Sequence, residues 1–257
     1  MVKSNDKPGV SPLFISTVQG IGKSIFFGWL ITDILGEANA ISSPTLTRVI
    51  TRFNAITNNK RLILVNEAKY SQSVDKDEFK SRITESQVIT ESKGVNAQSI
   101  DSNECYILCS NDLEQTSITC RERRMCVIGC LEEKMTEFEF ERFSKCRSEC
   151  ADDFMTFLTN VDINGYHPST FPVTELKKEI IESNLSLEGQ FCSTYLIGGK
   201  QKRSDTYAAY VKWLGDEKIA GRVSHDYKEV GSKKFISSAG NIASTQSNGK
   251  HYYKLTK

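Results

Sequence analysis

The residues most able to do chemistry lie near the start of the chain, in Thr17-Val-Gln-Gly-Ile-Gly-Lys-Ser24. Two glycines allow a tight turn whose N–H groups can converge on an anion. The lysine could contact the β- and γ-phosphates of a nucleotide, and the serine hydroxyl could bind Mg²⁺. Thr17 replaces the usual first glycine of such loops, and Gly-Lys-Ser also occurs by chance. We expect ATP and Mg²⁺ to be bound by Gln19, Gly20, Ile21, Gly22, Lys23 and Ser24.

The segments around this loop predict an α/β fold. A short apolar strand ends at Ser16 before the loop, and the amphipathic run 25–35 after it is typical of a helix. Two further apolar runs, 61–67 and 105–111, end in polar residues and resemble strands of a buried parallel sheet. The carboxyl ends of such strands share one edge of the sheet, where open α/β sheets bind ligands. We therefore expect the loop and the two polar strand ends to lie side by side.

These segments together resemble a known family. The chain resembles the C-terminal ATPase of superfamily 3 helicases, in the branch of poxvirus-type and phage or plasmid primase-helicases. The matching segments are Thr17–Ser24 (Walker A), Leu62–Glu67 (Walker B), Phe79–Glu85 with Ile89–Gly94 (the B′ region), Tyr106–Asn111 (motif C) and the cluster Arg121–Arg124. The resemblance covers roughly residues 10–175 and implies a P-loop ATPase of the AAA+ type with a central parallel sheet.

Catalytic roles follow from the resemblance and from the chemistry of the residues. Glu67 would orient the attacking water, and Asn111 would contact the γ-phosphate and that water. Arg123 or Arg124 would neutralise charge in the transition state on the nucleotide of a neighbouring subunit. Which arginine does so stays open. Glu67 could otherwise be a solvated acid, and Asn111 a turn residue.

The predicted metal site departs from the family pattern. Mg²⁺ would be held by Ser24, Asn66 and Glu67. Many relatives have an acidic residue at the position of Asn66. An asparagine can bond a metal-bound water but adds no charge, so the resemblance leaves metal affinity open.

The eight cysteines include three pairs spaced i,i+4. Two of these pairs lie in strand-like runs and form no C-x-x-C motif. We expect buried free thiols, with structural zinc and disulfides as the weaker alternatives.

The C-terminal part of the chain is basic. Residues 189–257 carry twelve Lys or Arg and five Asp or Glu, although the whole chain has a net charge of +1. Helices over 205–214 and 232–239, followed by a hairpin turning at Asn248-Gly249, give the order of a winged-helix module. We expect an ATPase core over 1–172, a helical linker over 173–199 and a small winged-helix module over 200–257.

Two regions are predicted to contact DNA. By resemblance, Lys93 sits at the tip of a hairpin that projects into a ring's central channel. In the C-terminal module, Lys233 and Lys234 on the second helix and Lys250 on the wing could contact phosphates. Surface lysines that serve only solubility, and tyrosines that only build a core, are the alternative.

We therefore interpret the chain as an ATP-dependent replicative DNA helicase of a virus or mobile element. It would form a homo-oligomeric ring, a hexamer, on single-stranded DNA or a forked duplex, and the resemblance implies movement from 3′ to 5′. Relatives carry further N-terminal regions, so we expect a primase on a separate chain or a truncated copy. The alternative is a nucleotide-switched initiation or packaging adaptor that binds DNA and hydrolyses little ATP. No apolar run is long enough to cross a bilayer, so we expect an intracellular protein without membrane contact, in the host cytoplasm, a viral factory or the nucleus.

Overall fold

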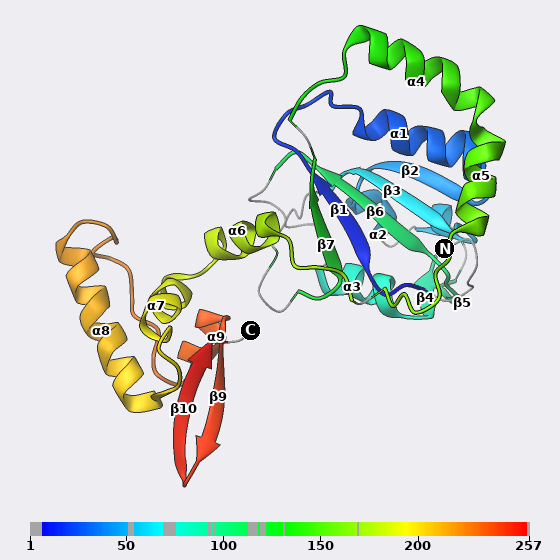
Figure 1. Cartoon of the computed structure of the whole chain (residues 1–257). Helices are drawn as coiled ribbons and strands as arrows, with labels where there is room; N and C mark the ends of the chain where they lie inside the picture. The colour runs from blue at the N-terminus through cyan, green and yellow to red at the C-terminus, as the bar shows by residue number, and fades with distance from the viewer. Residues whose placement is uncertain are drawn as a thin grey trace. The chain divides into compact units, whose positions relative to one another are not determined.

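A computed structural model describes residues 7–50, 54–68, 76–91, 94, 96–112, 118, 122–130, 132–168 and 170–255. The chain forms two compact units (Figure 1). The first unit is Met1–Ser117 with Arg123–Lys177, and the second is Ile118–Glu122 with Lys178–Lys257. The division falls inside α6 (Glu175–Ser183).

A five-stranded parallel sheet forms the centre of the first unit (Figure 1). Its strands, in the order β2–β3–β6–β1–β7, are Ala40–Thr45, Leu62–Glu67, Cys105–Ser110, Ser11–Ile15 and Met125–Gly129. The strands predicted over 61–67 and 105–111 are thus confirmed as β3 and β6. The edge strand β2 was not predicted, because Pro44 interrupts its apolar pattern, and a proline is tolerated at a sheet edge.

Helix α1 lies over one face of this sheet, and two further helices lie beyond it (Figure 1). The helix predicted over 25–35 is α1 (Lys23–Trp29), which continues as a π-helical segment, η1 (Leu30–Leu35). Trp29 of α1 lies 5.9 Å from the ring of Phe143 in α4 (Glu137–Glu149) and 5.1 Å from Phe154 in α5 (Ala151–Asn160). The residue pattern over 136–158 is typical of one continuous helix, but the backbone leaves the helical conformation at Cys150 and two helices form.

A buried ionic network lies on the opposite face. Arg82 of α3 (Lys76–Thr84) is 1% exposed, and its guanidinium lies 3.6 Å from a carboxylate oxygen of Glu104, itself 3% exposed. The hydroxyl of Tyr106 in β6 donates to Glu104 at 2.6 Å, and the ring of Phe79 packs edge-on against Tyr106. These contacts anchor α3, which leads into the antiparallel hairpin of β4 (Gln87–Thr90) and β5 (Gln98–Asp101). Two short helices, α2 (Thr47–Ile50) and the 3₁₀ turn η2 (Ala55–Thr57), connect β2 to β3.

Among its described residues, the second unit contains a small antiparallel sheet and several helices. Its elements after α6 are α7 (Leu187–Tyr195), β8 (Gln201–Lys202), α8 (Arg203–Ile219), α9 (Phe235–Ala239), β9 (Ile242–Ser247) and β10 (Lys250–Leu255), with the strand order β8–β10–β9. The predicted hairpin is confirmed, because β9 and β10 meet at a turn in which Asn248 and Gly249 have φ of 50° and 70°. The short strand β8 was not predicted.

Helix α7 contributes to the core of this unit. Phe191 and Cys192 of α7 are buried with Tyr210, Phe235 and Tyr253. The sequence assigns residues 173–199 to a linker, yet these apolar side chains of α7 pack with the helices and strands that follow.

The carboxylate of Glu188 links α7 to three other segments. It is fully buried and accepts hydrogen bonds from the hydroxyls of Tyr210, Tyr227 and Ser238 at 2.6–2.9 Å. Burial alone would raise the pKa of Glu188, but these hydrogen bonds and one from its own backbone lower it below the usual value. The carboxylate is therefore ionised and ties the unit together.

No helix in the described part of the chain is long and apolar enough to cross a membrane.

Candidate functional site

A loop with two left-handed glycines joins β1 to α1. Gly20 and Gly22 have φ of 82° and 92°, a region that L side chains rarely adopt, although a Cβ at either position would meet only side-chain atoms at ordinary distances. The backbone conformation, and not crowding, therefore requires glycine. Gln19, Gly20 and Ser24 are exposed, and Ile21, Gly22 and Lys23 are half-buried. The strand, loop and helix thus follow in the order that the sequence predicts.

Two hydroxyl groups hold the start of the loop. Ser16 donates to the carbonyl of Val18 at 2.8 Å. Thr17, which stands where such loops usually have glycine, donates to a carboxylate oxygen of Glu132 at 2.7 Å. The loop is thereby tied to the segment that follows β7.

Lys23 and Asn111 meet at the carboxyl edge of the sheet. The ammonium of Lys23 donates to Oδ1 of Asn111 at 2.9 Å, across 88 residues of sequence. The contact forms because β6 is hydrogen-bonded directly to β1, so the end of β6 lies beside the loop. Two of the predicted residues are therefore in direct contact.

Glu67 and Asn66 end the next strand, β3. Glu67 is exposed at the same edge, and the backbone N–H of Ala68 donates to the Cys109 carbonyl at 2.8 Å, which fixes the strand end against β6. The amide of Asn66 donates to Ser42 in β2 at 2.8 Å. Among the described residues, no donor reaches the buried Oδ1 of Asn66. We refer to Lys23, Asn111, Asn66 and Glu67 as the carboxyl-edge site.

Arg123 and Arg124 lie at the other end of the strands. They precede β7, and the carbonyl of Arg124 accepts a hydrogen bond from the N–H of Ser11, the first residue of β1. A strand of this length separates them from the carboxyl edge by about 13 Å. Arg123 is exposed and Arg124 is half-buried. The structure therefore brings neither arginine to the carboxyl-edge site of its own chain.

A cavity of about 580 Å³ opens beside Lys23. Its walls are largely apolar, with two carboxylates and two lysines. The lining residues are Phe14, Ile21, Gly22, Lys23, Phe26, Phe27, Cys130, Glu133, Lys134, Met135 and Glu139. The wall formed by Cys130, Glu133, Lys134, Met135 and Glu139 was not predicted from the sequence; the signals that could have found it are its position directly after β7 and the capping box of Thr136 with Glu139.

Two cysteines near Lys23 are unreactive thiols. Burial raises the pKa of Cys109 to about 12, and the Lys23 ammonium opposes this only in part. Burial also raises the pKa of Cys130, although the positive charge of Lys23 lowers it in part. Both are protonated near neutral pH and are poor nucleophiles. Over the described residues, all seven cysteines are free, and no three His, Cys, Asp or Glu side chains group as they would around a metal ion.

The predicted DNA contacts fall in different places. Lys93, expected in the connection of the β4–β5 hairpin, lies outside the described residues. Lys233, Lys234 and Lys250 are exposed in the second unit. The sequence places the first two on a helix over 232–239, which is wrong: the N–H of Lys234 bonds the carbonyl of Gly231 in a turn, and α9 begins only at Phe235.

Part of the sequence matches a known family. Residues 14–124 match a family described as "Family of unknown function (DUF5906)". The match runs from β1 through Arg124 and includes every predicted residue of the carboxyl-edge site. No curated protein matches the sequence.

Solved structures share the fold over almost the whole chain. The apo structure of the NrS-1 C-terminal region (305–718) has a TM-score of 0.68 at 19% identity, covering 99% of this chain and 68% of that one. Two A-form apo structures of the same region give TM-scores of 0.66 and 0.63 at 20% and 18% identity, covering 99% and 98% of this chain and 68% of theirs. At such low identity the likeness establishes the fold alone.

Proposed function

We propose that the chain is a P-loop ATPase of the AAA+ type that acts as a replicative DNA helicase of a virus or mobile element. One observation carries the proposal: the 2.9 Å hydrogen bond between Lys23 and Asn111. It joins the lysine of a glycine-rich loop to the polar end of a strand that lies between the loop and Glu67. A γ-phosphate that enters between Lys23 and Asn111 would replace this bond with contacts to both side chains.

The residues at the carboxyl edge fit MgATP. The backbone of the loop and Lys23 would hold the phosphates, and the apolar cavity beside Lys23 offers a surface for the base. Mg²⁺, held by Ser24 with Asn66 and Glu67, would neutralise phosphate charge. The buried, unsatisfied Oδ1 of Asn66 is an acceptor of the kind that a metal-bound water can donate to. Glu67 would orient the attacking water.

The position of the arginines supports action between subunits. Arg123 and Arg124 lie at the opposite end of the strands from Lys23, so neither can serve the nucleotide of its own chain. In a closed ring, a heterologous interface brings one edge of a subunit against a different edge of its neighbour. An arginine from one subunit would thereby complete the site of the next.

The fold supports the remaining parts of the proposal. The strand order β2–β3–β6–β1–β7 puts the strand that leads to Asn111 between the strand that leads to the loop and the strand that ends in Glu67. The order α7, β8, α8, α9 and the hairpin β9–β10 fits a winged-helix module that would contact DNA. The structural likeness to the C-terminal region of NrS-1 extends over both units.

One observation favours a second candidate, a DNA-binding adaptor that uses ATP as a switch and hydrolyses little of it. Asn66 carries no charge, and its amide is engaged by Ser42 of β2. A site with one strand-end carboxylate would bind Mg²⁺ less tightly than a site with two.

The proposal is tested by ATP hydrolysis with and without single-stranded DNA. Single-stranded DNA should stimulate the wild-type rate. Asn111→Ala should lower the rate by roughly 100-fold, because one fixed contact to the transferring phosphate is lost. Asn103→Ala is the matched control, since the exposed Asn103 precedes the same strand at its other end.

Each outcome decides between the candidates. Stimulated hydrolysis that Asn111→Ala abolishes and Asn103→Ala preserves supports the helicase. ATP binding without stimulated hydrolysis favours the adaptor. Equal rates in Asn111→Ala and wild type would overturn the assignment of the carboxyl-edge site.

A further inference from the structure

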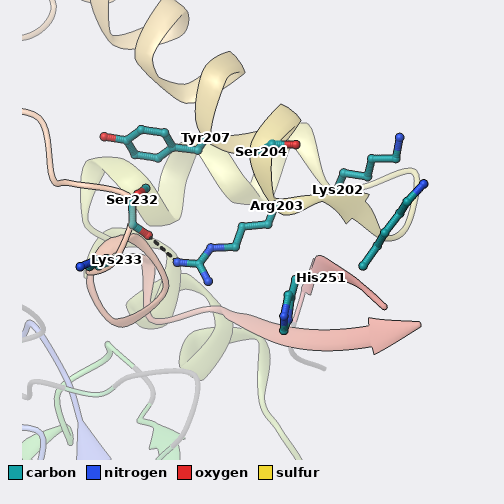
Figure 2. A pocket seen from close by; sticks show the side chains of 8 residues that line it. Lys202, Arg203, Ser204, Tyr207, Ser232, Lys233 and His251 are labelled. Carbon is teal, nitrogen blue, oxygen red and sulfur yellow. Dashed lines mark hydrogen bonds between the residues drawn. The ribbon is translucent and has the colours of Figure 1, made fainter. Parts of the chain in front are cut away.

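A cavity of about 850 Å³ lies in the second unit, apart from the carboxyl-edge site (Figure 2). It is formed where β8, the first turns of α8, the turn before α9 and the start of β10 come together. The lining residues are Lys202, Arg203, Ser204, Tyr207, Ser232, Lys233, Lys250 and His251. We call this cavity the basic pocket.

The basic pocket is lined by cations and contains no carboxylate. Three lysines and one arginine line it, together with His251, two serines and a tyrosine. The nearest acid in sequence, Asp205, accepts a hydrogen bond from Ser204 but is not a lining residue. Such a concentration of positive charge favours a polyanion, and the pocket's size is in the range of small-molecule sites, about 300–1,000 Å³.

Two side chains of the pocket are held in place before any ligand arrives. The guanidinium of Arg203 donates to the Ser232 carbonyl at 3.1 Å, as the dashed line in Figure 2 marks, and lies 5.9 Å from the Tyr253 ring. The hydroxyl of Tyr207 donates to the carbonyl of Val230 at 3.1 Å. Ordering these groups therefore costs little when a ligand binds.

Aromatic rings accompany the cations. The ring of Tyr207 and the imidazole of His251 line the same pocket as Lys233 and Lys250. Cations beside flat rings are the combination with which proteins hold unpaired nucleotides, because the phosphate pairs with charge and the base stacks on a ring. A base in a duplex is already stacked and paired, so it cannot use these rings.

The short helix α9 cannot replace the pocket as the main DNA contact. It has five residues and so extends about 7.5 Å, too little to follow a major groove. Lys234 at its start does not line the pocket, whereas its neighbour Lys233 does. We propose that the basic pocket binds a nucleotide unit of single-stranded nucleic acid, with the phosphate at Arg203, Lys233 and Lys250 and the base against Tyr207 or His251. This inference shares with the proposed function only the class of partner and does not depend on ATP hydrolysis.

The test measures binding of a fluorescent single-stranded oligonucleotide to the full chain by anisotropy, without ATP. Lys250→Ala should weaken binding by roughly fivefold and reduce the slope of log affinity against log salt by about 0.7. Lys254→Ala is the matched control, because Lys254 is exposed on the same strand but outside the pocket. Lys233→Ala should likewise weaken binding more than Lys234→Ala. These lysines are exposed, so an unchanged melting temperature is expected for all four variants.

The base contact is tested separately. His251→Phe keeps a ring and should bind the single strand more tightly than His251→Ala. A duplex of the same sequence should bind more weakly, and its affinities for the two variants should differ less. Single-stranded RNA should compete with DNA, and a nucleoside monophosphate should compete better than inorganic phosphate.

Three results would overturn the proposal. Equal losses in Lys250→Ala and Lys254→Ala would mean that general surface charge binds the strand. Equal binding of duplex and single strand, or equal competition by inorganic phosphate and nucleoside monophosphate, would remove the base contact. Because no ATP is present, these results stand even where hydrolysis is absent and the proposed function fails.

Discussion

The carboxyl-edge site and the basic pocket differ in how the chain builds them. The first joins residues from three strands far apart in sequence, and the parallel sheet alone brings Lys23, Asn111 and Glu67 to one edge. The second gathers residues from three short stretches, 202–207, 232–233 and 250–251, where helices and strands begin or end. A site of the first kind can be recognised in the sequence, because a polar residue follows each apolar strand.

The two sites also differ in charge. The carboxyl-edge site and its adjoining cavity combine Lys23 and Lys134 with the carboxylates of Glu67, Glu133 and Glu139. Mixed charge suits a metal-chelated phosphate on which water must be activated. The basic pocket has cations only, which suits holding an anion without changing it. The proposed function therefore places hydrolysis in the first unit and nucleic-acid binding in the second, and the predictions below test this separation.

The largest effects are expected from Lys23 and Glu67. Lys23→Ala should abolish ATP binding, because it removes the cation that would contact the phosphates in the proposed function. Glu67→Gln should bind ATP but hydrolyse it at least about 100-fold more slowly, since the amide cannot accept a proton. Nucleotide binding by fluorescence and phosphate release would be measured on each variant.

The matched control for Glu67 is Glu85→Gln, an exposed carboxylate after α3. It should hydrolyse ATP at the wild-type rate. Wild-type hydrolysis by Glu67→Gln would refute the role of Glu67, and a similar loss in Glu85→Gln would point to an indirect effect of charge.

A smaller effect, the partial recovery of ATPase activity, is expected when two inactive variants are mixed. In a ring, a subunit with intact Glu67 next to one with intact arginines forms a working interface. An equal mixture of Glu67→Gln with Arg123→Ala or Arg124→Ala should therefore recover about a quarter of the wild-type ATPase activity. The arginine whose variant is inactive alone but recovers activity in the mixture is the one that acts between subunits. No recovery with either, in assemblies verified by light scattering, would argue against a shared site.

Much of the first unit could be predicted from its sequence, because its signals are local. The apolar runs over 61–67 and 105–111 are strands, and the glycines before Lys23 have the positive φ that a phosphate-binding loop requires. Parallel strands then place their ends together by geometry. The contact of Lys23 with Asn111 depends on these elements and also on the order of the strands in the sheet. That order could not be predicted from the sequence.

Other features leave weak or no local signals. The edge strand β2 contains Pro44, and β8 is two residues long, so neither has a readable apolar period. The break at Cys150 lies in a continuous helical pattern. The role of α7 depends on contacts with residues more than 15 positions away, such as Tyr210 and Phe235, which no local pattern shows. The basic pocket depends on the same tertiary packing.

The smallest effects are expected from two helical glycines of the second unit. Gly189 in α7 is buried, and a Cβ there would lie 2.7 Å from the carbonyl oxygen of Ala239 and 3.1 Å from a methyl of Leu185. Gly215 in α8 is exposed, and a Cβ there would meet nothing within 4 Å. Gly189→Ala should lower the free energy of unfolding by about 1–3 kcal/mol through overpacking. Gly215→Ala should raise it by about 0.5–1 kcal/mol, because alanine loses less backbone entropy in a helix.

Thermal unfolding followed by circular dichroism would measure both changes, and ATP hydrolysis would be measured on the same samples. If α7 is a core element of the second unit, Gly189→Ala should shift the unfolding of that unit to lower temperature and weaken DNA binding with it. Hydrolysis without DNA should be retained at temperatures where the first unit stays folded, because Lys23, Asn111 and Glu67 all belong to that unit. A stable Gly189→Ala variant would show that α7 can move away from Ala239 at little cost. Equal loss of hydrolysis and DNA binding would instead mean that the carboxyl-edge site and the basic pocket depend on a common folding unit.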